Sequence, residues 1–370
     1  MNAKVRGSDA KVVAAYCSHG HAPYILAAAV GKQMGNVIVP YFEEYRNQCE
    51  ILRYWVGSDR VYLDANLGEL LSRVSFKGDY RDFIFRNVRY GKDIREEIRS
   101  YEESGFDTFS LDGKKRHFDM ANVRLSLGAR NLPFPERTYY IFPALGSETA
   151  ERCPYEVKDR EAFIEIVRRE EEKYRAILIP EANTFSYTTR QRMPMEVSVP
   201  PLALAFSSDE VLEADGVYYS LSGTGSGLNR EVIKAVEAAQ RLNLVVYKPK
   251  ELELQYGIDA GAKAMLDSHV IAVIARAGFG TLWNLQVAER PIIAPEFKEG
   301  DDPEVYHNNK TVTALGLGVV FDSFDEDVLR NAMRKPVCIS ALNRHIVEKY
   351  GSLDGIEYAA SIISGIEESQ

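Results

Sequence analysis

The sequence predicts an α/β fold of two doubly wound, parallel-sheet domains that face each other across a cleft. Three observations support this prediction. The first 40 residues read as strand, polar turn, helix and strand. Short apolar strands alternate with helical patterns through the second half of the chain. Two strands of that half lead into glycine-rich turns. Such alternation favours parallel strands that are joined by right-handed helical crossovers.

The opening unit has a recognisable pattern at each of its steps. Val12 to Tyr16 is an apolar run that predicts the first strand, and a polar turn follows at Cys17 to Pro23. Apolar residues at helical spacing then predict a helix from about Tyr24 to Met34. Asn36 to Pro40 reads as the second strand, which completes a strand–helix–strand unit.

The middle of the chain marks the division between the two domains. Residues 159 to 175 have the pattern of an amphipathic helix, and 177 to 179 follow as a short buried strand. Residues 181 to 216 contain three prolines and little periodicity, which is typical of a connector. The expected domains are therefore residues 1–205 and residues 206–370.

The second half repeats the strand and helix pattern more clearly. Asn229 is placed to cap a helix that carries its apolar residues on one face. The predicted strands are Val217 to Leu221, Leu244 to Tyr247, Val270 to Ile274, Ile292 to Ala294 and Val319 to Phe321.

Composition excludes several classes of protein. The formal net charge of -9 argues against nucleic-acid binding through a basic surface. Four scattered cysteines predict neither a disulfide framework nor a structural metal. No apolar run approaches the ~20 residues of a membrane span, and no signal peptide is recognisable, so a cytoplasmic protein is expected.

Arg73 to Arg95 holds seven basic residues with interleaved aromatics, and reads either as a solvated helix face or as a surface for an acceptor or anionic lipid. Peripheral membrane contact therefore stays open.

The first glycine-rich turn comprises Gly223, Thr224, Gly225, Ser226 and Gly227, between a predicted strand and a predicted helix. Without a Cβ in the way, the backbone N–H groups of such a turn can approach a phosphate. An ordinary strand-to-helix turn is the alternative, because this spacing of glycines alone is a weak signal.

The second turn has more features of a phosphate site. Gly278 and Gly280 allow close approach to the start of a helix, whose dipole favours an anion. Thr281 offers a hydroxyl, and Arg276 offers a positive charge. A diphosphate is the expected occupant, and a tight turn with a surface arginine is the alternative.

The polar loop from Glu296 to Asn309 follows a strand, at the edge where open α/β sheets bind ligands. Glu304 and Asn308 are candidates for hydrogen bonds to sugar hydroxyls. The five acidic residues of the loop could instead suggest a metal, but a solvated loop explains them better, so no metal site is predicted. Helix capping alone would also justify an asparagine.

His19 and His21 lie in the turn after the first strand. Histidine titrates near neutral pH and can act as a general base at such a position. Surface histidines without a catalytic role are the alternative.

Together these motifs resemble the GT-B glycosyltransferases, whose two domains are Rossmann-like. The UDP-glycosyltransferases and the bacterial N-acetylglucosaminyl transferase of lipid II synthesis are the nearest groups. The resemblance over 270 to 321 is the most specific, and it implies donor contacts at Arg276, Gly278, Phe279, Gly280, Thr281, Asn284, Glu304 and Asn308. The segments that carry it are a histidine in the first turn, Gly223 to Gly227, Arg276 to Thr281, Pro291 to Pro295, Asp302 to Asn308 and Gly316 to Gly318.

Two departures from the family pattern bear on the donor. The family has a glutamate three positions after the threonine that binds ribose, whereas this chain has Asn284. Asparagine can bind ribose without charge assistance, so the base or the affinity can differ from the UDP norm. Glu304-Val305 stands where the family has a Gln or Asp-Gln pair, which changes recognition of the donor sugar.

The resemblance implies an inverting, metal-independent sugar transfer from a nucleotide-sugar, with UDP-sugar the first choice, to an acceptor hydroxyl. His21 is the preferred base and His19 its competitor. The acceptor can be a small molecule, a glycan or a lipid-linked sugar. Two alternatives stay open: a nucleotide-sugar hydrolase or epimerase on the same architecture, and a non-catalytic nucleotide-binding protein.

Overall fold

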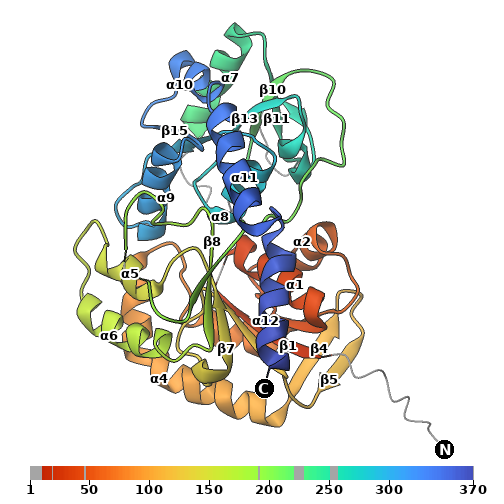
Figure 1. The fold of residues 1–370 in the computed structure, drawn as a ribbon, viewed down its shortest axis with the longest axis vertical. Coiled ribbons are helices and arrows are strands. Elements are labelled where there is room, and N and C mark those ends of the chain that lie inside the picture. Colours follow the sequence, from red (N-terminus) through yellow and green to blue (C-terminus); the bar gives the residue numbers. More distant parts are fainter. Residues whose placement is uncertain are drawn as a thin grey trace, which may run out of the picture.

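The computed structural model describes residues 11–18, 20–45, 47–190, 192–220, 229–250 and 257–369, with the backbone alone at 229–233. Two lobes, each built on its own sheet, are stacked along the long axis of the molecule (Figure 1). The first sheet has nine strands in the order β5-β4-β3-β2-β1-β6-β7-β8-β9, and the second has six in the order β12-β11-β10-β13-β14-β15. The predicted architecture of two sheet domains is thereby confirmed.

The first sheet is parallel except at one edge. There β4 and β5 form an antiparallel hairpin, and β4 also runs antiparallel to β3. This hairpin was not predicted. The strands are β1 (Val12–Cys17), β2 (Asn36–Pro40), β3 (Val61–Asp64), β4 (Phe106–Ser110), β5 (Lys115–Phe118), β6 (Val123–Leu127), β7 (Thr138–Ile141), β8 (Ala176–Pro180) and β9 (Glu196–Val199).

Helices cover both faces of this sheet, as its buried central strands require. The longest, α4, begins after Asp79, whose carboxylate accepts a hydrogen bond from the backbone N–H of Arg81 and caps the helix. The elements are α1 (His21–Met34), α2 (Gln48–Trp55), α3 (Ala65–Ser72), α4 (Tyr80–Ser104), the 3-10 helix η1 (Pro135–Arg137), α5 (Gly146–Glu151) and α6 (Arg160–Glu171).

The second sheet is parallel throughout. Its strands are β10 (Gly216–Tyr219), β11 (Val245–Lys248), β12 (Ile258–Asp259), β13 (Val270–Ile274), β14 (Ile292–Pro295) and β15 (Gly318–Phe321). Its helical elements are α7 (Asn229–Arg241), the 3-10 helix η2 (Ala262–Leu266), α8 (Phe279–Val287), α9 (Pro303–Ala314), α10 (Glu326–Ala332) and α11 (Pro336–Tyr350), and α12 (Gly355–Glu368) ends the chain.

The centre of the first sheet shows why the opening unit was predictable. β1 pairs in parallel with β2 on one side and β6 on the other, and five of its six residues are buried. A strand covered on both faces reads as a continuous apolar run. The α1 helix begins three residues earlier than predicted, so His21 occupies its first position.

The connector of 181–216 is less irregular than its prolines suggest. Residues Glu196–Val199 form β9, which pairs in parallel with β8. The predicted helix of 159–175 is confirmed but shorter, from Arg160 to Glu171, because Asp159 adopts left-handed backbone (φ 60°) just before it.

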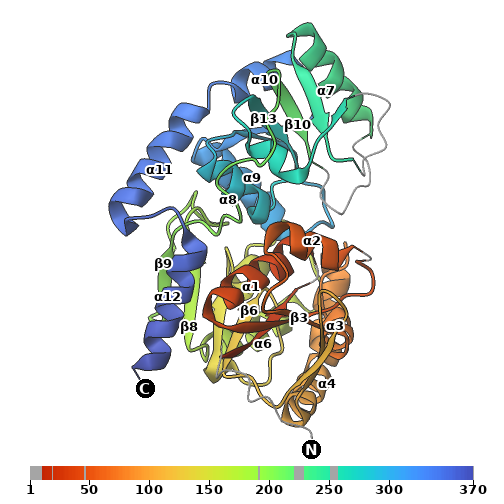
Figure 2. The same cartoon turned by 90° about the vertical axis from the view of Figure 1, so that its right-hand side faces the viewer.

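The last helix leaves the second lobe. Figure 2 shows α11 leading down from the second lobe and α12 lying along the first. There α12 packs against α1 and β9, and Glu367 accepts a hydrogen bond from Tyr139 (2.6 Å) and pairs with Arg175 (3.1 Å). The domain boundary between residues 205 and 206 stays a prediction. The structure shows in addition that the end of the chain, α12, packs on the first lobe. None of the helices in the described ranges is long and apolar enough to cross a bilayer.

Candidate functional site

A cleft of about 2330 Å³ separates the two sheets. The loops that follow β1, β6 and β7 line it from one side, and those that follow β10, β13 and β14 line it from the other. Both sheets thus present the carboxyl ends of their parallel strands to the same space, which is where open α/β sheets bind ligands.

The first turns of α1 and α8 touch across this cleft. A Cβ placed on Gly280 would lie 2.5 Å from the Cβ of Ala22, so only a glycine fits there without movement of one helix. His21 is the residue before Ala22, and Gly280 lies within the predicted phosphate turn. The predicted base and the predicted phosphate turn therefore line one site, although His21 and Gly278 are 257 residues apart in the chain.

The ring of His21 packs against two tyrosines. Its centroid lies 4.8 Å from that of Tyr45 and 5.9 Å from that of Tyr24, both edge-on. Burial lowers the pKa of His21, which keeps the imidazole neutral and able to accept a proton. Within the described residues no carboxylate is hydrogen-bonded to the ring, which packs against these two tyrosines.

The turn before α8 has the features of an anion site. The N–H groups of Phe279 and Gly280 open the helix and have no intrahelical acceptor. Arg276 lines the cleft beside them and is ion-paired with Asp301. A diphosphate at this turn would compete with Asp301 for the guanidinium group.

Asn284 has a partner within the chain. Its Oδ1 accepts a hydrogen bond from the backbone N–H of Leu204 (2.7 Å), and its side chain is buried. The preceding residue of the same helix is fixed similarly, because Trp283 donates its indole N–H to the carbonyl of Ala182 (2.8 Å). The side chain expected to contact ribose therefore also holds α8 against the connector.

Glu304 and Asn308 take different positions on α9. Glu304 lines the cleft, and burial together with the neighbouring Asp302 raises its pKa. Asn308 is fully buried outside the cleft lining, and its Nδ2 donates to the carbonyl of Ala277 (2.7 Å) and to Glu304 (3.2 Å). Glu304 can thus face a donor sugar directly, whereas Asn308 supports the α8 turn and Glu304 from behind.

Some predicted residues lie outside the described ranges. These are His19 and the whole first glycine-rich turn, Gly223, Thr224, Gly225, Ser226 and Gly227. Their proposed roles stay predictions. Nor does the described part of the chain hold a group of three or more His, Cys, Asp or Glu side chains placed to bind a metal ion.

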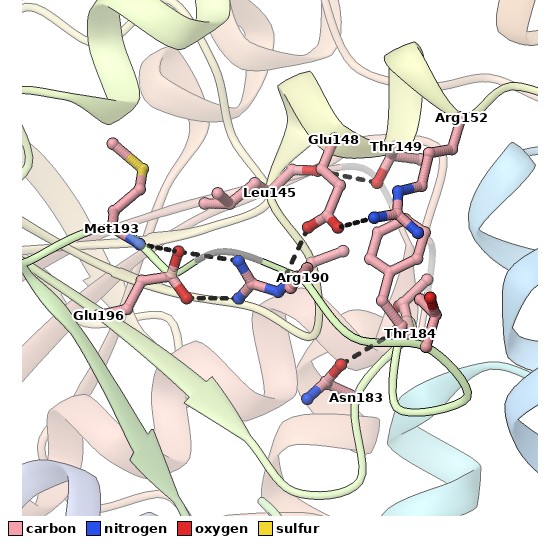
Figure 3. Close-up of polar contacts among 12 residues, drawn as sticks. Leu145, Glu148, Thr149, Arg152, Asn183, Thr184, Arg190, Met193 and Glu196 are labelled. Carbon is pink, nitrogen blue, oxygen red and sulfur yellow. Dashed lines mark hydrogen bonds and ion pairs between the residues drawn. The ribbon is translucent and has the colours of Figure 1, made fainter.

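A buried polar network supports the cleft wall behind α5 (Figure 3). The carboxylate of Glu148 faces Arg152 (3.2 Å) and Arg190 (3.4 Å), and Arg190 forms a two-pronged ion pair with Glu196. Burial raises the pKa of Glu148, although both arginines lower it. This network fixes the connector to the first lobe.

The same connector is joined to the second lobe through His307 of α9. The Nε2 of this ring donates to the carbonyl of Arg152 (2.8 Å), which leaves Nδ1 to accept from the hydroxyl of Tyr187 (2.8 Å). Burial lowers the pKa of His307 from 6.5 to about 4, and the charges of Lys310 and Arg152 add to this. The folded protein therefore holds the neutral ring.

We expect His307 to make the fold sensitive to acid. Because its folded pKa lies below its unfolded pKa, its contribution is fully present above pH 6.5 and is lost as the pH falls toward 4. The shift corresponds to a loss on the order of 3 kcal/mol. Urea unfolding at pH 7 and near pH 4 measures it: the drop in unfolding free energy should be smaller for His307→Gln than for the unmodified protein.

The exposed His345 on α11 supplies the control. His345→Gln should keep the full acid-dependent drop in unfolding free energy. An equal drop in His307→Gln and the unmodified protein would show that the contacts of His307 do not couple folding to pH.

Sequence reasoning did not identify Arg130, a charged residue of the cleft. Arg130 lies on the loop after β6, in a region to which no strand was assigned. The alternating V-R-L-S-L of Val123–Leu127, followed by Gly128, is the signal that could have placed a strand end there.

No known family's sequence profile matches this chain, and no curated protein matches it in sequence. Solved structures match it over nearly its whole length. A UDP-glucosyltransferase from Polygonum tinctorium has a TM-score of 0.63 at 11% identity, with 98% of this chain and 100% of the other covered. The glycotransferase of kitacinnamycin has a TM-score of 0.61 at 11% identity, with 97% and 100% covered.

A third match, the protein LpCGTa solved in complex with UDP, has a TM-score of 0.58 at 13% identity and covers 96% of this chain and 99% of its own. At such identities the likeness concerns the fold. The chain therefore has the two-domain GT-B fold of these glycosyltransferases.

Proposed function

We propose that this protein transfers a sugar from a nucleoside-diphosphate sugar to an acceptor hydroxyl, with inversion at the anomeric carbon and without a metal ion. The observation that carries the proposal is the contact between Ala22 and Gly280. It sets His21, a partly buried histidine whose pKa is lowered by burial, beside the N-terminus of α8 in a large cleft.

The proposed reaction uses these two groups on opposite reactants. The acceptor oxygen attacks the anomeric carbon while His21 takes its proton, and the bond from that carbon to the diphosphate oxygen breaks. The electron pair stays on the departing nucleoside diphosphate. Its charge is stabilised by the N–H groups and the helix dipole at Phe279 and Gly280, and by Arg276 once released from Asp301.

UDP is the first candidate for the nucleotide. A solved structure of the same fold binds UDP, and another is a UDP-glucosyltransferase. The hydrogen bond between Asn284 and Leu204 argues that ribose is held here without the side-chain oxygen of this position. We therefore expect weaker dependence on ribose than on the diphosphate.

A thermal-shift screen of the full chain tests the donor site. UDP, ADP, GDP and dTDP should be compared with the nucleosides uridine and adenosine, which lack the diphosphate. A ligand at about 100 times its Kd stabilises the fold by about 2.7 kcal/mol, so at least one diphosphate should raise Tm by several degrees. Absence of a shift with every diphosphate would contradict the proposal.

Product analysis separates transfer from the alternatives. A hydrolase releases free sugar from the donor rapidly without an acceptor, and an epimerase converts the donor to its stereoisomer. The proposed transferase should do either only slowly. Nucleotide binding without any turnover across a varied acceptor panel would favour a non-catalytic binding protein.

A further inference from the structure

Arg130 lies on a tightly held loop of the first lobe. Gly128 and Asn131 both adopt positive φ (78° and 60°), which turns the loop directly after β6. The backbone N–H of Asn131 donates to Glu170 (2.8 Å). Arg130 itself is only 8% exposed, and its exposed part lines the cleft.

The guanidinium group of Arg130 has a fixed orientation. One terminal nitrogen donates to the hydroxyl of Tyr140 (2.8 Å), which in turn donates to the carbonyl of Ala144 (2.7 Å). The other donates to the carbonyl of Ala129 (3.1 Å). Its far side lies against Gly146, where an added Cβ would come within 2.3 Å of Nε. Little entropy remains to be lost when such a group binds a ligand.

Arg130 lacks an ion-pair partner. In the described part of the chain no carboxylate lies within 4 Å of it, and two hydrogen bonds account for only two of its N–H donors. Nearby buried carboxylates have other partners: Glu171 accepts from the N–H of Gly146 (2.7 Å), and Glu170 accepts from Tyr174 (2.6 Å). Glu171 and Glu170 favour the charge of Arg130 without direct contact, so N–H donors of the guanidinium group remain available to the carboxylate of a ligand.

The cleft around Arg130 also indicates the rest of that ligand. Aromatic side chains of the first lobe line the same wall, which favours a flat apolar body beside the charge. These are Phe76, Tyr80, Phe83, Phe142 and Phe163. We propose that Arg130 binds a carboxylate of a small-molecule substrate, and that this substrate is an aromatic acid serving as the acceptor. This inference rests on the proposed transferase function.

The position of Arg130 favours the acceptor as the source of the carboxylate. The loops after β1 and β6 are neighbours, joined by a bridge between Cys17 and Gly128, and parallel strands lie about 4.8 Å apart. His21, at the start of α1, and Arg130, on the loop after β6, thus lie on neighbouring segments of one wall, opposite the α8 turn. An aromatic acid held by Arg130 can present its hydroxyl toward His21.

The second source of a carboxylate is a uronic acid on the donor sugar. Asp302 and Glu304, on the donor side, feel the charge of Arg130. Burial raises the pKa of both carboxyls, and Arg130 partly offsets this. A donor uronate would have to reach Arg130 from the second lobe, whereas an acceptor on the aromatic wall lies on the same lobe as Arg130, so we favour the acceptor.

Calorimetric binding to the full chain tests the proposal. The probes are para-hydroxybenzoate and para-hydroxycinnamate, each against its neutral amide, with UDP present. The proteins are the unmodified chain, Arg130→Gln, Arg130→Lys and Arg89→Gln, an exposed arginine of α4 that serves as the matched control. At least one acid should bind roughly tenfold or more tighter than its amide. Arg130→Gln should abolish this preference, Arg130→Lys should reduce it, and Arg89→Gln should keep it.

Several results would overturn the inference. These are equal binding of acid and amide, no binding of either acid, or an acid preference that survives in Arg130→Gln. A preference for UDP-glucuronate over UDP-glucose that depends on Arg130, without any acid preference among acceptors, would overturn the acceptor assignment and place the carboxylate on the donor. UDP binding that persists in these cases leaves the proposed function intact, whereas loss of UDP binding in the unmodified chain contradicts that function itself.

Stability measurements separate ligand binding from a structural role. If Arg130 serves a ligand, Arg130→Lys, which keeps the positive charge, should unfold near the same urea concentration as the unmodified chain. A clear loss of stability in both Arg130→Gln and Arg130→Lys would instead mean that the arginine holds the first lobe together, and would overturn the proposal.

Discussion

Replacing His21 with glutamine is expected to lower kcat/KM for sugar transfer by about 100-fold or more, since general bases contribute factors of this size. Nucleoside diphosphate binding should be retained, because the proposed partner of His21 is the acceptor, whereas the diphosphate is expected at the N–H groups of the α8 turn. Initial rates with a chromogenic acceptor, and calorimetry with UDP, measure the two quantities. His117→Gln, which changes an exposed histidine of β5, is the control.

The pH profile of kcat/KM gives an independent check. A base acts in its neutral form, and burial lowers the pKa of His21, so activity should persist below the ordinary imidazole value of 6.5 and fall only at lower pH. Folding must be monitored at each pH because of His307. Full activity in His21→Gln would show that His21 is not the general base and would make His19 the next candidate. His19→Gln would then test that role.

Replacing Gly278 with alanine is expected to weaken UDP binding by about tenfold or more, equivalent to about 1.4 kcal/mol or more. An added Cβ at Gly278 meets nothing within 4 Å, and its φ of -93° suits alanine, so the fold accommodates the change. The new methyl group would nevertheless occupy the approach to the α8 turn, where the diphosphate is expected. Calorimetry measures the affinity.

Gly365 on α12 is the matched control, because a Cβ there also meets nothing within 4 Å. Gly365→Ala should leave UDP affinity unchanged. Unaltered UDP affinity in Gly278→Ala would show that the diphosphate does not bind at this turn. Gly280→Ala tests the helix contact instead: it should lower both stability and activity, and Ala22→Gly in the same chain should restore them, because it removes the methyl group that collides.

The elements predicted well were those whose signal lies within a few residues. Val12 to Tyr16 and Asn36 to Pro40 were found because central parallel strands are apolar throughout. The strand β9 was missed because its residues are only half-buried at an edge, so neither continuous nor alternating apolarity marks it. The helix start at His21 was not predicted because its N-cap residue is Gly20, which has no side chain to form a capping hydrogen bond.

The site was predictable in part for the same reason. Glycine-rich turns at strand ends and a histidine after the first strand are local patterns. The ion pair of Arg276 with Asp301, the hydrogen bond from Leu204 to Asn284, and the lack of an ion-pair partner for Arg130 among the described residues are not local patterns. Each depends on which distant residues the fold places within a few ångströms.

By itself, the sequence determined two parallel sheets, the order of most of their strands along the chain, and an anion-binding turn with a candidate base. Periodic burial and glycine placement encode these features in neighbouring residues. Only the tertiary structure decided that Ala22 meets Gly280, that α12 returns to the first lobe, and that Arg130 faces the cleft with no carboxylate of the described residues within 4 Å. These depend on packing between segments far apart in the chain, where steric fit and charge pairing, and not local propensity, select the contacts.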